Sequence, residues 1–225
     1  MTMRSSSTVW CLVGLAAVLI PASARAGEDI AKALCPVTGE AINLAVSTET
    51  DDGLVFFCCK ACVKKYAESP DKFGEQVAAQ RKVLATRDKV QVKCPVTGNP
   101  ADSKVFAEHE GRKVHFCETD CIAKFQADRG KYQRALANAY TYQTKCPVMG
   151  ETINPKSFAT LATGETIYYC CKGCDRKLQA EPEKYAANLA SQGLRINVEK
   201  LKASTKDEPE EEHDHDHGDH EGHDH

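Results

Sequence analysis

The chain has 225 residues, a formal net charge of −3 and an aromatic content of only 7%, yet it contains twelve cysteines. A chain of this length would ordinarily form one or two domains with a sizeable core. So many cysteines and so few aromatic side chains instead favour several small units that depend on cross-links or metal for stability. The basic residues are spread thinly and are not interleaved with stacking aromatic residues, which argues against nucleic acid as a partner.

Residues 1–26 have the features of a secretory signal peptide. Arg4 supplies the positive start, residues 9–20 the apolar stretch, and residues 24–26 the small-x-small cleavage site. The alternative is an uncleaved anchor, but the apolar stretch is short for a membrane span. We therefore expect an exported protein, periplasmic or secreted, whose mature chain begins at Gly27 and does not span a membrane.

Removal of this segment would leave an odd number of cysteines. Cys11 would be lost and eleven would remain, in a compartment where thiols ordinarily pair. At least one thiol must then stay unpaired or bridge two chains. This arithmetic favours ligation of metal over a pure disulfide scaffold.

A self-similar pattern occurs three times along the chain. Each copy opens with Cys-Pro-Val-x-Gly and reaches an apolar, aromatic run that ends in Cys-x-x-x-Cys. The first two cysteines are 23, 23 and 24 residues apart in the three copies, and the last two are always 4 apart. The three cysteine sets are Cys35, Cys58 and Cys62; Cys94, Cys117 and Cys121; and Cys146, Cys170 and Cys174.

Each copy predicts a small α+β module. Cys-Pro-Val-x-Gly is a tight turn, because proline fixes its own φ and glycine accepts a positive one. A glycine in a polar loop (Gly53, Gly111 or Gly164) then precedes the apolar run, which predicts a β-hairpin whose second strand delivers the later cysteines. A helix should begin near the last cysteine of each copy. Apolar residues four and eleven positions after it share one helical face and should cover the metal site.

A second helix should follow in each copy. In the first copy, Ser69 is the expected cap and Pro70 the first-turn proline of a helix over residues 73–84. Asp128 and Glu181 are expected to play similar parts later in the chain.

The predicted organisation is a signal peptide, three modules and a tail, over residues 1–26, 27–88, 89–140, 141–200 and 201–225. Residues 87–93 and 139–145 are the linkers, and they are short enough for the modules to touch. Residues 197–206 should lead out of the last module.

The tail is acidic and rich in histidine. It has ten acidic residues and six of the eight histidines of the chain, a composition that cannot form a core and predicts disorder. Alternating imidazoles and carboxylates suit zinc, nickel or copper(II). The alternative is a tail that only improves solubility. The candidate ligands are His213, His215, His217, His220, His223 and His225.

The repeated pattern resembles the YHS domain and the related TRASH-type heavy-metal modules. The resemblance rests on Cys-Pro-Val-x-Gly, a glycine, an aromatic residue before Cys-x-x-x-Cys, and a Pro-x-x-Tyr or Pro-x-x-Phe ending. It is best in the third copy, over residues 164–174 and 182–185, whereas the second has Arg129-Gly130 in place of the proline. That family binds, traffics and senses heavy metals, often attached to transporters or regulators. The resemblance implies metal handling, with a membrane metal transporter or another exported protein as partner.

Three thiolates suit copper(I) or zinc, although structural zinc requires four ligands. The first and third copies offer Cys59 and Cys171 in addition, and the second offers Glu118 or Asp120. Neighbouring side chains on a strand point to opposite faces, so whether Cys59 and Cys171 are ligands stays open.

Two other interpretations of the cysteines are weaker. A disulfide within each set is promoted by an oxidising compartment but leaves an odd thiol in the second copy. A thioredoxin-like Cys-x-x-Cys occurs at Cys59 and Cys171, but the second copy lacks it and no βαβ pattern surrounds it. No nucleophile, base and orienting group recur together, so we do not expect an enzyme.

The sequence thus predicts an exported heavy-metal-binding protein that sequesters, buffers or passes on a thiophilic ion, zinc or copper. The alternative is an interaction scaffold in which permanently bound zinc only holds the modules in shape.

Overall fold

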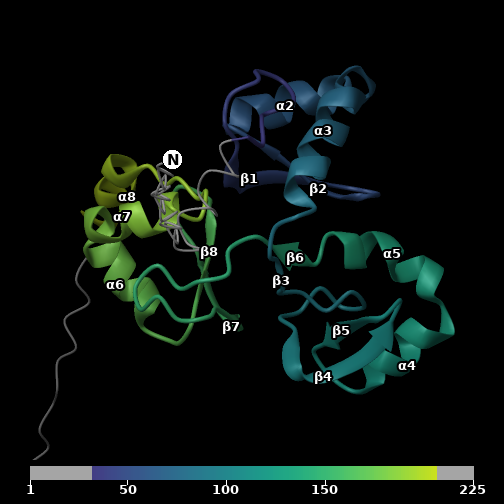
Figure 1. Ribbon diagram of the computed structural model, residues 1–225. Helices are drawn as coiled ribbons and strands as arrows, with labels where there is room; N and C mark the ends of the chain where they lie inside the picture. Colours follow the sequence, from purple (N-terminus) through teal and green to yellow (C-terminus); the bar gives the residue numbers. More distant parts are fainter. Residues whose placement is uncertain (1–31, 207–225) are drawn as a thin grey trace, which may run out of the picture.

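The computed structural model describes residues 32–206. The predicted signal peptide and the histidines of the tail lie outside these residues. The described part contains seven α-helices and four two-stranded antiparallel sheets (Figure 1). The α+β class and the three small modules predicted from the sequence are confirmed. None of the helices within residues 32–206 is both long enough and apolar enough to span a bilayer.

The modules share one order of elements, a hairpin followed by two helices. Module 1 has β1 (Asn43–Thr50), β2 (Gly53–Phe57), α2 (Lys60–Glu68), the 3-10 helix η1 (Pro70–Phe73) and α3 (Gly74–Leu84). Module 2 has β4 (Asp102–His109), β5 (Arg112–Phe116), α4 (Asp120–Ala127) and α5 (Arg129–Ala137). Module 3 has β7 (Asn154–Thr160), β8 (Thr166–Tyr169), α6 (Cys174–Ala180), α7 (Pro182–Ala190) and α8 (Val198–Lys206).

The three hairpins carry the same irregularity. In each, the register shifts near the start of the first strand, between Asn43 and Ser47 in β1 and at the corresponding places in β4 and β7. A bulge of this kind bends its strand and increases the local twist. The predicted glycines stand at the turns, and Gly53 has a φ of 110°, which a residue with a side chain rarely adopts.

The predicted helix starts are correct in part. Asp128 caps α5, because its Oδ1 accepts a hydrogen bond from the Lys131 N–H at 3.1 Å. Ser69 makes no side-chain cap, and Glu181 makes none. Ser69 ends α2, where its backbone N–H bonds to Tyr66, and η1 intervenes before α3 begins at Gly74. Asp128 also ends one helix, α4, before it caps the next, so the two positions are alike and differ only in the side-chain bond.

The two predicted linkers contain strands. Within them, β3 (Val90–Gln91) and β6 (Tyr140–Thr141) pair antiparallel, and the Val92 N–H adds a bond to the Ala139 carbonyl at 2.8 Å. Since one segment enters module 2 and the other leaves it, this pair forms a neck from which the whole module extends (Figure 1). Sequence could not show this pairing because the two segments are short and far apart in the chain.

Modules 1 and 3 share one hydrophobic core. Ile42, Leu44 and Phe57 of the first module belong to the same buried cluster as Ile167 and Leu194 of the third. Backbone bonding joins them too, since the Leu44 N–H donates to the carbonyl of residue 193 at 2.9 Å. The two modules are therefore one folding unit, although module 2 separates them in sequence.

Module 2 has a separate and much smaller core. Its buried cluster consists of Cys94, Val114, Phe116, Cys121 and Phe125. Two of these five residues are cysteines of the repeated pattern. Partly buried apolar residues such as Ile122, Tyr132 and Leu136 pack against this cluster, which remains much smaller than the core of modules 1 and 3.

The predicted tail begins too early. Residues 197–206 were expected to lead out of module 3 and the disordered tail to start at residue 201, but helix α8 continues to Lys206. Leu201 is only 1% exposed and lies in the shared core. Burial of this side chain and bonding of the Asn197 Oδ1 to the Lys200 N–H at 2.8 Å stabilise the helix.

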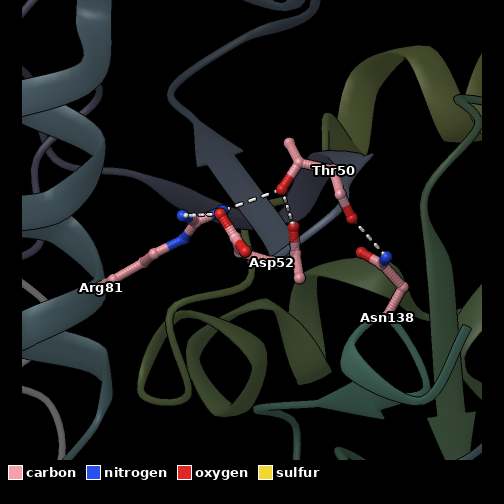
Figure 2. Close-up of polar contacts among 5 residues, drawn as sticks. Thr50, Asp52, Arg81 and Asn138 are labelled. Carbon is pink, nitrogen blue, oxygen red and sulfur yellow. Dashed lines mark hydrogen bonds and ion pairs between the residues drawn. The ribbon is translucent and has the colours of Figure 1, made fainter. Parts of the chain in front are cut away.

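The modules touch, as the short linkers predict. Figure 2 shows the end of the β1–β2 hairpin held from two sides. Arg81 of α3 bonds to Thr50 Oγ1 at 2.8 Å and to Asp52 at 3.3 Å. From module 2, the buried Asn138 donates to the Thr50 carbonyl at 2.7 Å. Because Asn138 follows the last turn of α5, this bond orients the second module against the first.

The shared core yields a test by hydrogen exchange. Leu194→Ala should destabilise modules 1 and 3 together, by about 2–5 kcal/mol, because it opens a cavity in their common core. Amides of β1 and β2 should lose protection with those of β8, while α4 and α5 change little. Phe116→Ala is the matched control and should expose module 2 alone. Loss of protection confined to module 3 after Leu194→Ala would show that the cores are separate.

Candidate metal centres

The first cysteine of each triad sits in a turn closed by two backbone hydrogen bonds. The Cys35 N–H donates to the Glu40 carbonyl at 2.7 Å, and the Gly39 N–H donates to the Cys35 carbonyl at 2.8 Å. The other copies repeat both bonds, and Gly39, Gly98 and Gly150 all have φ between 73° and 77°. The predicted Cys-Pro turn is confirmed, and it buries each first cysteine to 1% exposure.

The other two cysteines lie where the hairpin passes into a helix. Strand β2 ends at Phe57, so Cys58 lies just beyond it, and Cys62 lies in the first turn of α2. In each of the three modules the three sulfurs lie within 4.8 Å of one another. The first and third cysteines are buried and the second is half-buried. All eleven cysteines of the described residues are free thiols.

These separations suit a metal ion. Four sulfurs placed tetrahedrally about zinc, with bonds of about 2.3 Å, lie about 3.8 Å apart. Cys58 and Cys62 have their sulfurs 3.5 Å apart, and Cys117 and Cys121 have theirs 3.7 Å apart. Each triad can therefore hold a thiophilic ion with small adjustments of its side chains.

Cys59 and Cys171 lie beside the triads. The Cys59 sulfur is 3.6 Å from that of Cys62, and the Cys171 sulfur is 3.6 Å from that of Cys174. Strand alternation leaves open whether they are ligands, but both follow the last strand residue, where alternation no longer applies. Both are exposed.

Module 2 has no cysteine at this position. There the Glu118 Oε1 lies 3.6 Å from the Cys121 sulfur. Of the two acidic residues named from the sequence, Glu118 thus contacts the triad, whereas Asp120 is the first residue of α4.

The three thiols of a triad differ in acidity. Burial raises the pKa of Cys35, but hydrogen bonds from the Cys58 backbone N–H and from Thr38 outweigh it and bring the pKa down to about 7. Burial raises the pKa of Cys62, and the neighbouring thiols raise it further. Burial likewise raises the pKa of Cys121 to about 12. In module 1, Cys35 is therefore more acidic than Cys62, and a metal ion must displace protons to bind the thiols whose pKa is raised.

A buried glutamine, not predicted as functional, joins the two halves of each triad. In module 1, Gln80 is 2% exposed and bonds to both main-chain groups of Phe56, at 2.9 Å to the N–H and 2.8 Å to the carbonyl. Its Nε2 also donates to the Leu34 carbonyl at 2.9 Å. Leu34 precedes Cys35, and Phe56 lies two residues before Cys58. One side chain therefore fixes the segments of the first and second cysteines relative to each other.

The same three bonds recur in the other modules, from Gln91 to His115 (2.9 and 2.7 Å) and Lys93 (2.9 Å), and from Gln143 to Tyr168 (2.9 and 2.6 Å) and Lys145 (3.1 Å). We call these three residues the glutamine clamps. A signal was present in the sequence, because Gln-x-Lys-Cys-Pro-Val occurs in the second and third copies. In the first copy Lys32 takes that position, and Gln80 reaches the same place from α3.

Comparison with models of known protein families, with curated proteins and with solved structures finds no match to this chain. The class of this protein is therefore defined from its own fold and cysteine sites. The protein is an α+β chain of repeated cysteine-rich modules with three triads, each able to hold a metal ion.

Loss of a glutamine clamp should weaken metal binding. Gln91→Ala removes three hydrogen bonds to part-buried main-chain groups of His115 and Lys93, each contributing about 0.5–1.5 kcal/mol, and loosens the segment before Cys94. We expect at least a tenfold weaker affinity of module 2 for cobalt(II), measured by its visible absorption. Gln133→Ala, an exposed glutamine on α5, is the control and should change nothing. Equal affinities of both variants would show that the clamp does not position the ligands.

The positions of Cys59 and Cys171 predict a difference between metals. The double variant Cys59→Ser and Cys171→Ser should bind zinc much more weakly, because zinc prefers four donors, and copper(I) nearly as before. Competition with chelators of known affinity measures both metals. An equal loss for the two metals would mean that these thiols are not complementary ligands.

Proposed function

We propose that this is an exported heavy-metal-binding protein that sequesters, buffers or passes on a thiophilic ion, zinc or copper. The observation that carries the proposal is the threefold repetition of one centre, with three sulfurs within 4.8 Å in every module. A single cluster of thiols can arise as part of a core. Three clusters built by the same turn, strand end and helix support binding of metal as the purpose of the repeat.

The surroundings of the centres support exchange of the ion over a permanently filled scaffold. The second cysteine of each triad is half-buried, and Cys59 and Cys171 are exposed. An incoming ligand can therefore approach one side of the centre without unfolding the module. Modules 1 and 3 also have a large common core that supports their fold apart from metal.

Export and delivery belong to the same proposal. The resemblance to YHS and TRASH-type modules supports a partner that moves metal, namely a membrane metal transporter or another exported protein. We propose that residues 1–26 direct export, that the histidines of the tail gather ions for the modules, and that the protein binds metal without catalysing a reaction.

Native mass spectrometry of protein isolated from its own compartment tests the proposal, since it reports metal identity, metal count and disulfides together. The triple variant Cys94→Ser, Cys117→Ser and Cys121→Ser should carry one ion fewer and unfold mainly module 2, because binding energy at a site formed by folding contributes to folding. The separate core of module 2 makes this variant preferable to those of the other triads. Unchanged metal content of the reduced variant would contradict the proposal.

The tail has its own test. Free histidine titrates near pH ~6.5, so binding by the tail should fade as the pH falls from about 7 to 5. Deletion of residues 212–225 should remove a weak, pH-sensitive class of zinc or copper(II) sites and leave the tight thiolate sites intact. Titration calorimetry of both proteins at both pH values measures this. Identical isotherms would mean that the tail only improves solubility.

A further inference from the structure

One position next to the triads differs among the modules. Cys59, Glu118 and Cys171 each follow the second cysteine of their triad and precede the third by three residues. Each places a potential ligand atom 3.6 Å from the sulfur of that third cysteine. The backbone therefore delivers this side chain to the same place in all three modules, and only its chemistry changes.

The carboxylate of Glu118 is placed as a fourth ligand would be. In a tetrahedral zinc centre with Zn–S of about 2.3 Å and Zn–O of about 2.1 Å, a sulfur and an oxygen ligand lie about 3.6 Å apart. The Glu118 Oε1 and the Cys121 sulfur have this separation. Glu118 is exposed, so its side chain is free of the packing that would prevent a small approach to the ion.

We infer that the protein has two kinds of metal centre, a four-thiol centre in modules 1 and 3 and a centre of three thiols and the Glu118 carboxylate in module 2. The inference rests on the proposed function and adds that the centre of module 2 exchanges its zinc most readily. A carboxylate is a harder donor than a thiolate and holds thiophilic ions less strongly. The ion of module 2 is therefore the first to leave.

The small core of module 2 is a second, independent reason why its metal ion should be the most weakly bound. Cys94 and Cys121 supply two of its five buried residues, whereas the other triads lie in the large core shared by modules 1 and 3. Part of the binding energy in module 2 must therefore organise the module itself, which lowers its apparent affinity for metal. Donor chemistry and folding both make the middle centre the weakest.

The test titrates the full chain with cobalt(II) and with zinc in competition with a chelator. The wild-type protein should bind two ions tightly and a third at least tenfold more weakly. Glu118→Cys should strengthen the weak site at least tenfold and increase its sulfur-to-cobalt charge-transfer absorption. Glu118→Gln should weaken that site alone, and it keeps the size of the side chain, so the module stays folded. Asp120→Asn is the matched control and should leave all three affinities unchanged.

Three results would overturn the inference: three equal sites in the wild-type protein, an unchanged weak site in Glu118→Gln, or a stronger effect of Asp120→Asn than of Glu118→Gln. Absence of metal from all three modules is a different result. It would contradict the proposed function and would remove the basis of this inference with it.

Discussion

The structure depends on holding together three thiols that come from distant parts of each module. The first cysteine is 23 or 24 residues from the second, yet their sulfurs lie within 4.8 Å. Two different connections maintain this approach. The glutamine clamp joins the two segments through its side chain, and the backbone N–H of the second cysteine bonds to the sulfur of the first, as Cys58 does to Cys35. The second connection also stabilises the thiolate that a cation needs.

Two cores distribute the stability of the protein unequally. The shared core of modules 1 and 3 includes α8 and the segment around Leu194, so the last part of the described chain completes the first module. The buried Asn43 side chain strengthens this closure, because it bonds to both the N–H and the carbonyl of Arg195 at 2.9 and 2.8 Å. Module 2 extends from its neck with a separate core that is much smaller than the shared one. Bound metal should therefore contribute the largest share of the folding free energy in module 2, where the core is smallest.

The sequence predicted the elements whose determinants are local. The turn at Cys35, the hairpin at Gly53 and the helix that begins near Cys62 each follow from residues within a few positions. The spacing of the cysteines placed all nine thiols of the triads in three groups, which the structure brings together. Repetition strengthened every one of these predictions, because the same residues returned at the same distances.

What the sequence did not predict depends on contacts between distant segments. The neck pairs residues about fifty positions apart, and nothing within Val90–Gln91 indicates its partner. Helix α8 is stabilised because the Leu201 side chain is buried in the shared core. The polar composition of the following tail gave no indication of this burial. The clamp of module 1 could not be predicted from the repeat either. Gln80 lies in helix α3, whereas Gln91 and Gln143 precede the first cysteine of their modules.

The glutamine clamps also indicate that the hydrogen bonds that position the first two cysteines are a required feature of each module. Gln91 and Gln143 approach from the segment before the first cysteine, and Gln80 approaches from a helix beyond the third, yet all three make the same bonds. The glutamine thus comes from different positions in the sequence, but its hydrogen bonds are the same in all three modules. We take this to mean that each module requires these hydrogen bonds. At the position of Cys59, Glu118 and Cys171 the reverse holds, because one backbone route delivers two kinds of donor atom. The support of the thiols is thus constant across the three modules. The side chain beside the third cysteine is the part that changes, from a thiol in modules 1 and 3 to a carboxylate in module 2.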